Sequence, residues 1–184
     1  MKVLDLFSGL GGFSKAFKDR GHQVITIDNN PEFHPDICTD IMKLKKKDFK
    51  GYNYDIVLAS PPCIEFSKSC MPKSWKSVQK GCNPDTLLLQ KTLNIIYWID
   101  PKYWIIENVR GARPYFYPFL GKPVKKVGSR YLWGNFPIID VKQHYGKWKL
   151  PPSDNRSALR SLIPYELSLS LCKSIEVMKG YNVK

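Results

Sequence analysis

Short apolar runs alternate with segments of helical periodicity along the first two thirds of the chain. The runs predict buried strands over residues 3–7, 23–27, 54–59 and 103–106. Between the last two of them, the nearly continuous apolar segment 86–99 has the length of a helix and stops before Pro101. Strands that alternate with helices predict an α/β fold with a doubly wound, mostly parallel sheet.

The pattern changes after Arg110. Prolines and aromatic residues interrupt residues 114–163, where only residues 130–133 look like a strand, so we expect an irregular region there. From Pro164 onward, apolar side chains return at spacings of four, four and three residues, which predicts a closing amphipathic helix over 164–179. The length of 184 residues and the lack of internal repeats indicate a single domain, 1–184.

Composition narrows the class of protein further. Hydrophobic residues make up 43% and charged residues 24% of the chain, which is typical of a folded globular domain. No apolar run approaches the roughly 18 residues of a membrane span, and Asp5 interrupts any secretory signal. We therefore expect a soluble, cytoplasmic protein with no membrane partner. The five cysteines and three histidines lack metal-ligand spacing, so we expect reduced thiols and no metal.

The chain is strongly basic. It has 29 Lys and Arg against 16 Asp and Glu, a formal net charge of +13, which favours nucleic acid as the partner. A generally solubilising surface is the alternative. The lysine cluster from Lys43 to Lys50 lies beyond the third strand unit, and we favour a solvated face there over a contact with nucleic acid.

A glycine-rich turn follows the first strand. Gly9, Gly11 and Gly12 let the backbone approach a ligand closely, and Asp28, at the end of the second strand, can bind a ribose hydroxyl pair. The turn lacks the third glycine of a dinucleotide fingerprint and any Gly-Lys-Ser/Thr sequence. A nucleoside without phosphates therefore fits better than a nucleotide, although a tight turn in an unrelated α/β fold would have the same sequence.

Two further strand ends carry reactive side chains. Cys63 follows Ser60-Pro61-Pro62 at the edge of the sheet where α/β proteins bind ligands, and Glu107 follows the next apolar strand. A thiolate held there is a candidate nucleophile, and the carboxyl is a candidate proton donor. Taken alone, a single cysteine is more often a small buried apolar residue, and a glutamate at a strand end is usually structural.

Together these segments resemble the signature motifs of DNA (cytosine-5) methyltransferases, in the same order. The three main matches are Asp5 to Gly12, Pro61-Pro62-Cys63 with Phe66-Ser67, and Glu107-Asn108-Val109. Shorter matches are Asp40-Ile41, Asp85-Thr86-Leu87 and Arg130. The resemblance is close over residues 1 to 113. It implies a Rossmann-like methyltransferase fold and a minimal bacterial or phage enzyme of the restriction-modification type.

The resemblance also implies S-adenosylmethionine as cofactor, a ligand that brings no phosphate. The implied cofactor-binding residues are Phe7, Gly9, Leu10, Gly11, Gly12, Asp28, Asn29, Asp40, Ile41, Pro62 and Leu87. Among them, Asp28 would bind the ribose, and Asp40 with Ile41 would contact the adenine.

The implied reaction is methyl transfer to C5 of cytosine in double-stranded DNA. Cytosine C5 is a poor nucleophile, so a Cys63 thiolate would first add at C6. Glu107 would hold and protonate N3, and Arg130 would support O2. The target base must leave the duplex stack before any of these contacts form.

The segment from Ser67 to Lys80 is rich in lysine and contains no acid, so it is a candidate lid that contacts phosphates. An ordinary solvated loop is the alternative. The candidate nucleic-acid-binding residues are Ser67, Lys68, Lys73, Trp75, Lys76 and Lys80.

The space between Arg130 and Pro164 is too short for an independent target-recognition domain. Residues 160–164 resemble the family's last motif, with Arg160 and Ser161 where glycine and asparagine are expected. We therefore keep two alternatives: a DNA-binding or partner-dependent subunit whose partner supplies target recognition, and a methyltransferase acting on cytosine in RNA or a free nucleotide.

Overall fold

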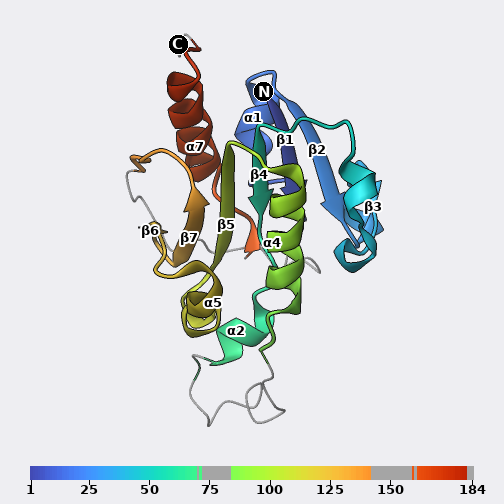
Figure 1. Cartoon of the computed structure of the whole chain (residues 1–184). Coiled ribbons are helices and arrows are strands. Elements are labelled where there is room, and N and C mark those ends of the chain that lie inside the picture. The colour runs from blue at the N-terminus through green and yellow to red at the C-terminus, as the bar shows by residue number, and fades with distance from the viewer. Residues whose placement is uncertain (70, 72–83, 142–158, 160, 182–184) are drawn as a thin grey trace.

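The computed structural model describes residues 1–69, 71, 84–141, 159 and 161–181. They include a seven-stranded sheet with the strand order β3-β2-β1-β4-β5-β7-β6. The strands are β1 (Lys2–Leu6), β2 (Gln23–Asp28), β3 (Ile37–Cys38), β4 (Ile56–Ala59), β5 (Tyr103–Val109), β6 (Lys125–Val127) and β7 (Arg130–Asn135). The first five are parallel, and β7 and β6 are antiparallel. The predicted doubly wound, mostly parallel fold is confirmed (Figure 1).

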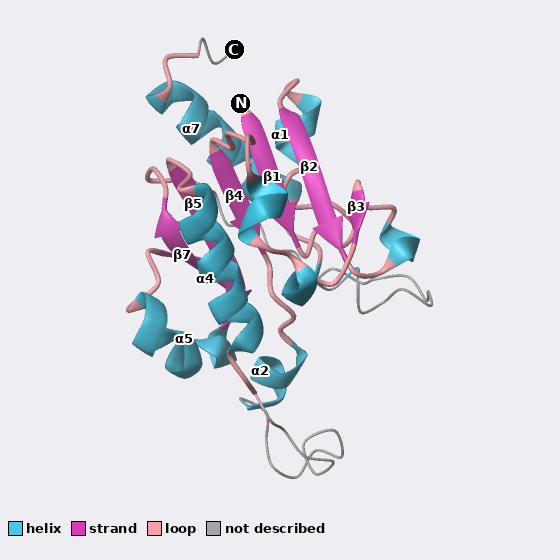
Figure 2. Ribbon diagram, turned by 45° about the vertical axis from the view of Figure 1, so that its right-hand side comes forward, coloured by secondary structure: helices cyan, strands magenta, loops and turns pink. Residues whose placement is uncertain are grey.

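Helices cover both faces of the sheet. The α-helices are α1 (Lys15–Asp19), α2 (Ile64–Ser69), α4 (Leu87–Ile99), α5 (Arg113–Leu120) and α7 (Tyr165–Met178). Short 3-10 turns are η1 (Pro31–Phe33), η2 (Ile41–Lys43), η3 (Lys46–Phe49) and η4 (Arg110–Ala112). Side chains of α1 and α7 pack in one core, and those of α2, α4 and α5 pack in the other (Figure 2).

The central strands explain why two cores form. All four residues of β4 are fully buried, and they alternate between the two faces. Ile56 and Leu58 join the core under α1 and α7, whereas Val57 and Ala59 join the core under α4. A strand that is apolar on both faces is stable only between two layers of helices, which is the arrangement seen here.

The strand predicted over 103–106 extends further than its apolar run. β5 continues through Glu107 and Asn108 to Val109, because β7 pairs with it antiparallel along its whole second half. Glu107 lies opposite Leu132 in this register, and Val109 lies opposite Arg130. The polar residues of the third motif are therefore held inside a paired strand.

The prediction of an irregular region over 114–163 is wrong where α5 and β6 form, whereas the strand predicted over 130–133 is confirmed as part of β7. Pro114 lies in the first turn of α5, where a helix needs no backbone N–H donor. Tertiary contacts then stabilise the segment, with the Phe116 ring centre 5.1 Å from that of Trp133. The closing helix α7 lies within the predicted range 164–179.

The connections bring the functional motifs to one edge. β1, β4 and β5 are parallel neighbours, so their carboxyl ends lie side by side, toward α2 at the bottom of Figure 1. Open α/β sheets bind ligands at this edge. Among the helices that the structure describes, none is long and apolar enough to cross a membrane.

Candidate active site

Cys63 follows β4 through two prolines, which stiffen its approach to the sheet edge. The Cys63 carbonyl accepts a hydrogen bond from the Ser67 N–H at 2.8 Å, and α2 begins at the next residue. Burial raises the pKa of the half-buried thiol, and the nearby Glu107 carboxylate raises it further, while Ser67 and Arg130 oppose the shift. The thiol therefore keeps its proton at neutral pH in this arrangement.

Glu107 is almost fully buried, with 8% of its surface exposed. Burial raises the pKa of its carboxyl to about 7, although Arg130 and the Ser60 hydroxyl pull it downward. The Nε of Arg130 lies 3.6 Å from Oε1 of Glu107. A carboxyl with a pKa near neutrality can both give and take a proton, which suits general acid–base work.

Asn108 joins the two reactive segments, although the sequence analysis gave it no role. Its side-chain amide donates a hydrogen bond to the Pro61 carbonyl at 3.0 Å, and its side-chain oxygen accepts one from the Val109 N–H at 2.9 Å. The residue is completely buried. Asn108 therefore fixes the loop that carries Cys63 against the strand that carries Glu107. In the sequence, the feature that could have identified Asn108 is its place as a second polar residue directly after Glu107 and the apolar run 103–106.

Arg130 connects this acid to a distant segment. Its Nη2 donates a hydrogen bond to the Leu162 carbonyl at 2.7 Å. Its Nε faces Glu107 but is buried without a hydrogen-bond partner among the described residues. The guanidinium therefore ties residues 161–163 to the candidate proton donor, and it keeps one N–H available for a ligand.

The glycine-rich turn adopts a backbone that most side chains disfavour. Gly9 and Gly11 have φ values of +51° and +76°, and Phe7 has φ of +58°, a strained value for an aromatic residue. Gly12 is required for a different reason: a Cβ there would lie 2.6 Å from Leu162 Cδ1 and 2.7 Å from the Ile163 carbonyl oxygen. The turn therefore packs directly on the 161–163 segment that Arg130 holds.

These segments enclose a small cavity. Its lining residues are Phe7, Ser8, Gly9, Leu10, Gly12, Phe13, Phe33, Ser60, Ser161, Leu162 and Ile163. The Ser60 hydroxyl is buried there without a geometrically formed hydrogen bond among the described residues. With a volume of about 80 Å³, the cavity can hold only part of a nucleoside; its close backbone approach, with no lysine or arginine among the described lining residues, suits a part of the ligand that carries no phosphate.

Asp28 supports the same turn. One carboxylate oxygen accepts a hydrogen bond from the Gly9 N–H at 2.8 Å, and the other accepts one from the Asn30 N–H at 2.9 Å. A carboxylate can accept about four hydrogen bonds, so acceptor capacity remains for a hydroxyl pair. Asn29, predicted beside it, is exposed.

The remaining predicted cofactor residues lie apart from this cavity. Asp40 accepts a hydrogen bond from the Met42 N–H at 2.9 Å and caps η2, while Ile41 is in the core with 5% exposure. Pro62 lines a second cavity of about 300 Å³ between α2 and α4, and Leu87 is exposed at the start of α4. Gly11 lines neither cavity. Their contacts with a cofactor stay predictions.

The predicted lid is described only at its start. Ser67 and Lys68 belong to α2 and not to a loop, because the helix continues to Ser69. Lys68 forms an ion pair with Glu65 at 2.5 Å. The other candidate nucleic-acid-binding residues, which are Lys73, Trp75, Lys76 and Lys80, lie outside the described residues. Arg160 of the predicted last motif also lies outside them.

Comparison with known proteins agrees with these motifs. The family profile of C-5 cytosine-specific DNA methylases matches residues 1–114. A probable DNA (cytosine-5)-methyltransferase of Frog virus 3 is 36% identical over 119 residues, covering 59% of this chain and 53% of its own. The type II methyltransferase M.HindV of Haemophilus influenzae is 31% identical over 121 residues, covering 59% of this chain and 38% of its own.

A solved structure supports the fold. The putative DNA modification methyltransferase encoded within an E. coli prophage superposes with a TM-score of 0.50 at 20% identity. The superposition covers 73% of this chain and 46% of that one. The chain spans about half the length of the Frog virus 3 relative and less of the Haemophilus influenzae one.

Proposed function

The chain belongs to the C-5 cytosine-specific DNA methylase family, and from this premise we propose that it transfers a methyl group from S-adenosylmethionine to C5 of cytosine in DNA. The observation that carries the proposal is one junction. Asn108 ties the Cys63 loop to the strand of Glu107, and Arg130 ties Glu107 to the wall of the glycine-turn cavity. A base and a methyl donor bound at this junction would be neighbours.

Part of the cofactor would occupy the cavity beside the glycine turn. S-adenosylmethionine supplies an electrophilic methyl group when it is bound. Phe7, Gly9 and Leu10 would contact it from the turn, Asp28 would accept hydrogen bonds from its ribose, and the Ser60 hydroxyl would meet it just after the end of β4. The described residues on these walls include no lysine or arginine, which supports a ligand without phosphate.

Cys63 would act as the nucleophile. Its sulfur adds to C6 of cytosine, and the electrons of the C5–C6 double bond move into the ring toward N3. The raised pKa of the thiol means that it must lose its proton on substrate binding. C5 then carries the electron density needed to attack the methyl group, and loss of the C5 proton expels Cys63.

Glu107 and Arg130 would stabilise the negative charge that develops on the cytosine ring during this addition. A protonated Glu107 can donate to N3 as electron density builds there, and its pKa of about 7 leaves a large protonated fraction at neutral pH. Arg130 has an unpartnered Nε–H beside Glu107, which suits a hydrogen bond to the cytosine O2.

DNA would be the polymer that carries the base. The net charge of +13 supports a polyanionic substrate, and extrusion of the base would bring C6 to Cys63. Target recognition in the first part of residues 114–163 would fall to α5, β6 and β7, alone or with a partner subunit.

The test is methyl transfer from labelled S-adenosylmethionine to unmodified double-stranded DNA, followed by digestion to nucleosides. We expect label in 5-methylcytosine, and we expect Cys63→Ala to abolish it while cofactor binding persists. Cys38→Ala is the matched control, because Cys38 is an exposed free thiol on β3.

Either of two results would contradict the proposal. Methyl transfer by Cys63→Ala would remove the nucleophile assignment. Cofactor binding without label in DNA, but with label in RNA or in a nucleotide, would move the substrate to the other class.

A further inference from the structure

The segment after Glu107 has an unusual charge pattern. Between Glu107 and Asp140 the sequence contains no acidic residue. It contains six cations over the same stretch: Arg110, Arg113, Lys122, Lys125, Lys126 and Arg130. Because the segment folds as η4, α5, β6 and β7 at one side of the sheet, its charges gather in one part of the molecule (Figure 1).

Most of these cations have no ionic partner. Arg130 lies beside Glu107, but the other five form no ion pair among the described residues. Elsewhere in the chain, Arg20, Lys68 and Lys179 are paired with carboxylates. Other lysines, such as Lys46 and Lys47, also form no ion pair among the described residues, so what distinguishes this segment is that no acidic residue accompanies its cations.

Two of the cations share one aromatic ring. The Arg113 guanidinium lies 5.3 Å from the ring centre of Tyr131, and the Lys126 ammonium lies 5.8 Å from it. Both side chains are exposed, whereas Tyr131 is 8% exposed. Two positive charges that each lie within 6 Å of one ring centre are less than 12 Å apart. They repel each other unless an anion lies near them.

This cationic patch, defined by Arg113, Lys126 and Tyr131, borders the candidate active site. Tyr131 is directly opposite Asn108 in the β5–β7 register, and Asn108 is the residue that follows Glu107. The side chain of Asn108 bonds to the Pro61 carbonyl in the loop that carries Cys63, so the patch lies on the face of β5 that meets this loop.

The basic cluster around Lys46 and Lys47 differs from the cationic patch in its acidic neighbours, its place in the fold and its lack of an aromatic contact. Lys46 and Lys47 are also exposed and form no ion pair among the described residues, but Asp48 follows them in η3 and Asp40 precedes them. They lie beyond β3, at the opposite side of the sheet from β7 and β6 (Figure 1). Neither lysine lies over an aromatic ring of the described residues.

We propose that the cationic patch binds the phosphate backbone of the DNA substrate next to the extruded cytosine. This inference rests on the proposed function and adds a binding surface to it. Arg113 would contact one phosphate and Lys126 a neighbouring one, with Tyr131 holding both cations in place. Such contacts fix the position of the strand without reading its sequence.

The experiment measures the salt dependence of DNA binding. Labelled double-stranded DNA is titrated with the full chain between about 50 and 200 mM KCl, and log K is plotted against log salt. Each lost phosphate contact lowers the slope by about one, so Arg113→Gln with Lys126→Gln should lower it by about two for any DNA sequence.

Two matched double variants interpret the result. Lys46→Gln with Lys47→Gln removes the same net charge from the other cluster and should change the slope by much less. Arg113→Lys with Lys126→Arg keeps both charges and should restore the slope. The proposal would be wrong if the conservative pair did not restore the slope, or if the control pair lowered the slope by the same amount.

The outcomes separate this inference from the proposed function. An unchanged slope in the glutamine double variant, with methyl transfer intact in the parent chain, overturns only the patch. A parent chain that binds cofactor but neither binds nor methylates DNA overturns both.

Discussion

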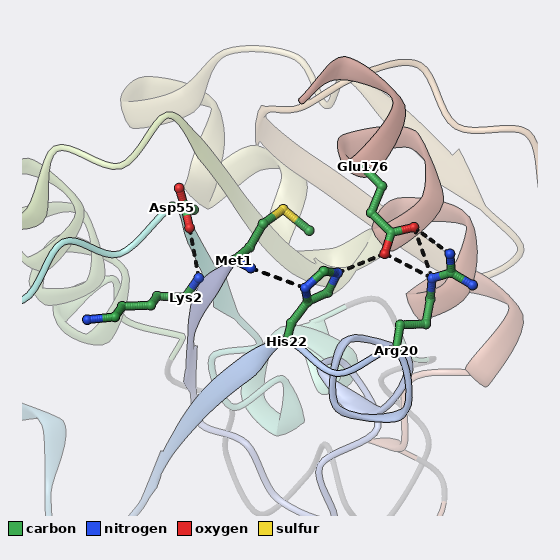
Figure 3. A network of polar contacts seen from close by, with 6 residues as sticks. All are labelled: Met1, Lys2, Arg20, His22, Asp55 and Glu176. Atoms are coloured by element: carbon green, nitrogen blue, oxygen red, sulfur yellow. Dashed lines mark hydrogen bonds and ion pairs between the residues drawn. The ribbon is translucent and has the colours of Figure 1, made fainter. Parts of the chain in front are cut away.

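At the amino ends of its strands, this sheet carries charges that are paired, whereas at the carboxyl ends it carries polar groups without full partners. On the paired side, the Glu176 carboxylate accepts hydrogen bonds from Arg20 Nε at 2.9 and 3.0 Å, and its Oε1 lies 2.8 Å from His22 Nε2 (Figure 3). Asp55 accepts a hydrogen bond from the Lys2 N–H at 2.7 Å.

The pKa values of these carboxyls follow from the pairing. Burial alone would raise the pKa of Glu176, but Arg20 and His22 outweigh it and hold the pKa below its usual value. Cys172 is buried beside the same carboxylate, and burial with that charge raises the pKa of its thiol to about 12. The cluster therefore keeps a charged carboxylate and a protonated thiol, and its role is to join α7 to α1 and β2.

The carboxyl ends show the reverse. Burial raises the pKa of both Asp5 and Glu107 to about 7. Three of the four buried polar atoms without hydrogen bonds among the described residues lie toward this edge: Asp5 Oδ1, Ser60 Oγ and Arg130 Nε. The fourth is the hydroxyl of Tyr103, which is the first residue of β5 and lies at the amino end of that strand.

The contrast separates two uses of buried charge. A paired charge stabilises the fold only through its partner, whereas an unsatisfied polar group destabilises the free protein and can be satisfied by a ligand. Stability and chemistry therefore lie at opposite ends of the same strands. Variants at the two ends should change different measurements.

The largest expected effect belongs to Glu107→Gln. Removing the proton donor should slow methyl transfer by roughly 10²- to 10⁴-fold. The amide mimics the protonated carboxyl in shape, so cofactor binding should persist and the free energy of unfolding at pH 7 should be unchanged or higher. Single-turnover methyl transfer and urea unfolding of the same preparation measure the two quantities.

A Glu107→Gln protein that is fully active but less stable would reverse the comparison. Glu107 would then be a structural residue, and the carboxyl end would be no different from the amino end.

The next effect concerns stability alone. Glu176→Gln breaks a buried charge pair, which should lower the free energy of unfolding by about 3 kcal/mol, because Arg20 loses its counter-charge. Glu166→Gln, at the exposed start of the same helix, is the control and should change it by about 0.5 kcal/mol or less. Urea denaturation measures both.

Cofactor binding by Glu176→Gln should match that of the parent chain below the unfolding transition. A loss of cofactor affinity in this variant, with the fold intact, would show that the two edges are coupled.

The contrast also explains what the sequence could predict. Apolar runs predicted the central strands, α4 and α7, since burial on both faces leaves a pattern in the sequence. The motifs at strand ends predicted where Cys63 and Glu107 lie, because parallel neighbours share an edge. Partners far apart in the chain leave no such pattern: Arg20 and Glu176 are 156 residues apart. β6 likewise depends on pairing with β7, and α5 on packing Phe116 against Trp133 of β7, not on their own propensity.

Asp40 and Gly12 show the same limit within the site. Each matched a family motif, but the structure gives each a structural task as well: Asp40 caps η2, and Gly12 makes room for Leu162 and Ile163. A residue type is visible in a sequence, whereas its competing hydrogen bonds and close contacts are visible only in three dimensions.

The smallest expected effect, counted per group and per pH unit, is a slope in the dependence of stability on pH. Between pH 4.5 and 7, folded Glu107 holds a proton that the unfolded chain has released, so a rise in pH favours unfolding. One such group contributes at most about 1.4 kcal/mol per pH unit. Asp5 contributes with the same sign. Glu176 has the opposite sign: its stabilisation is present above pH 4.5 and is lost as the pH falls.

Urea denaturation of three proteins from pH 3 to pH 8 tests both signs. The parent chain should lose stability on either side of a maximum near pH 4.5, where the Glu176 stabilisation is present and the loss from Glu107 and Asp5 begins. Glu107→Gln should roughly halve the decline toward pH 7, since Asp5 still contributes, and it should leave the acid side unchanged. Glu176→Gln should reduce the slope on the acid side alone, where Asp36 and Asp55, whose pKa values are also lowered, still contribute. The fall toward neutral pH is assigned to the carboxyl ends of the strands, and Glu176 acts on the acid side from the amino ends. If both variants changed the same side of the curve, this assignment would be wrong.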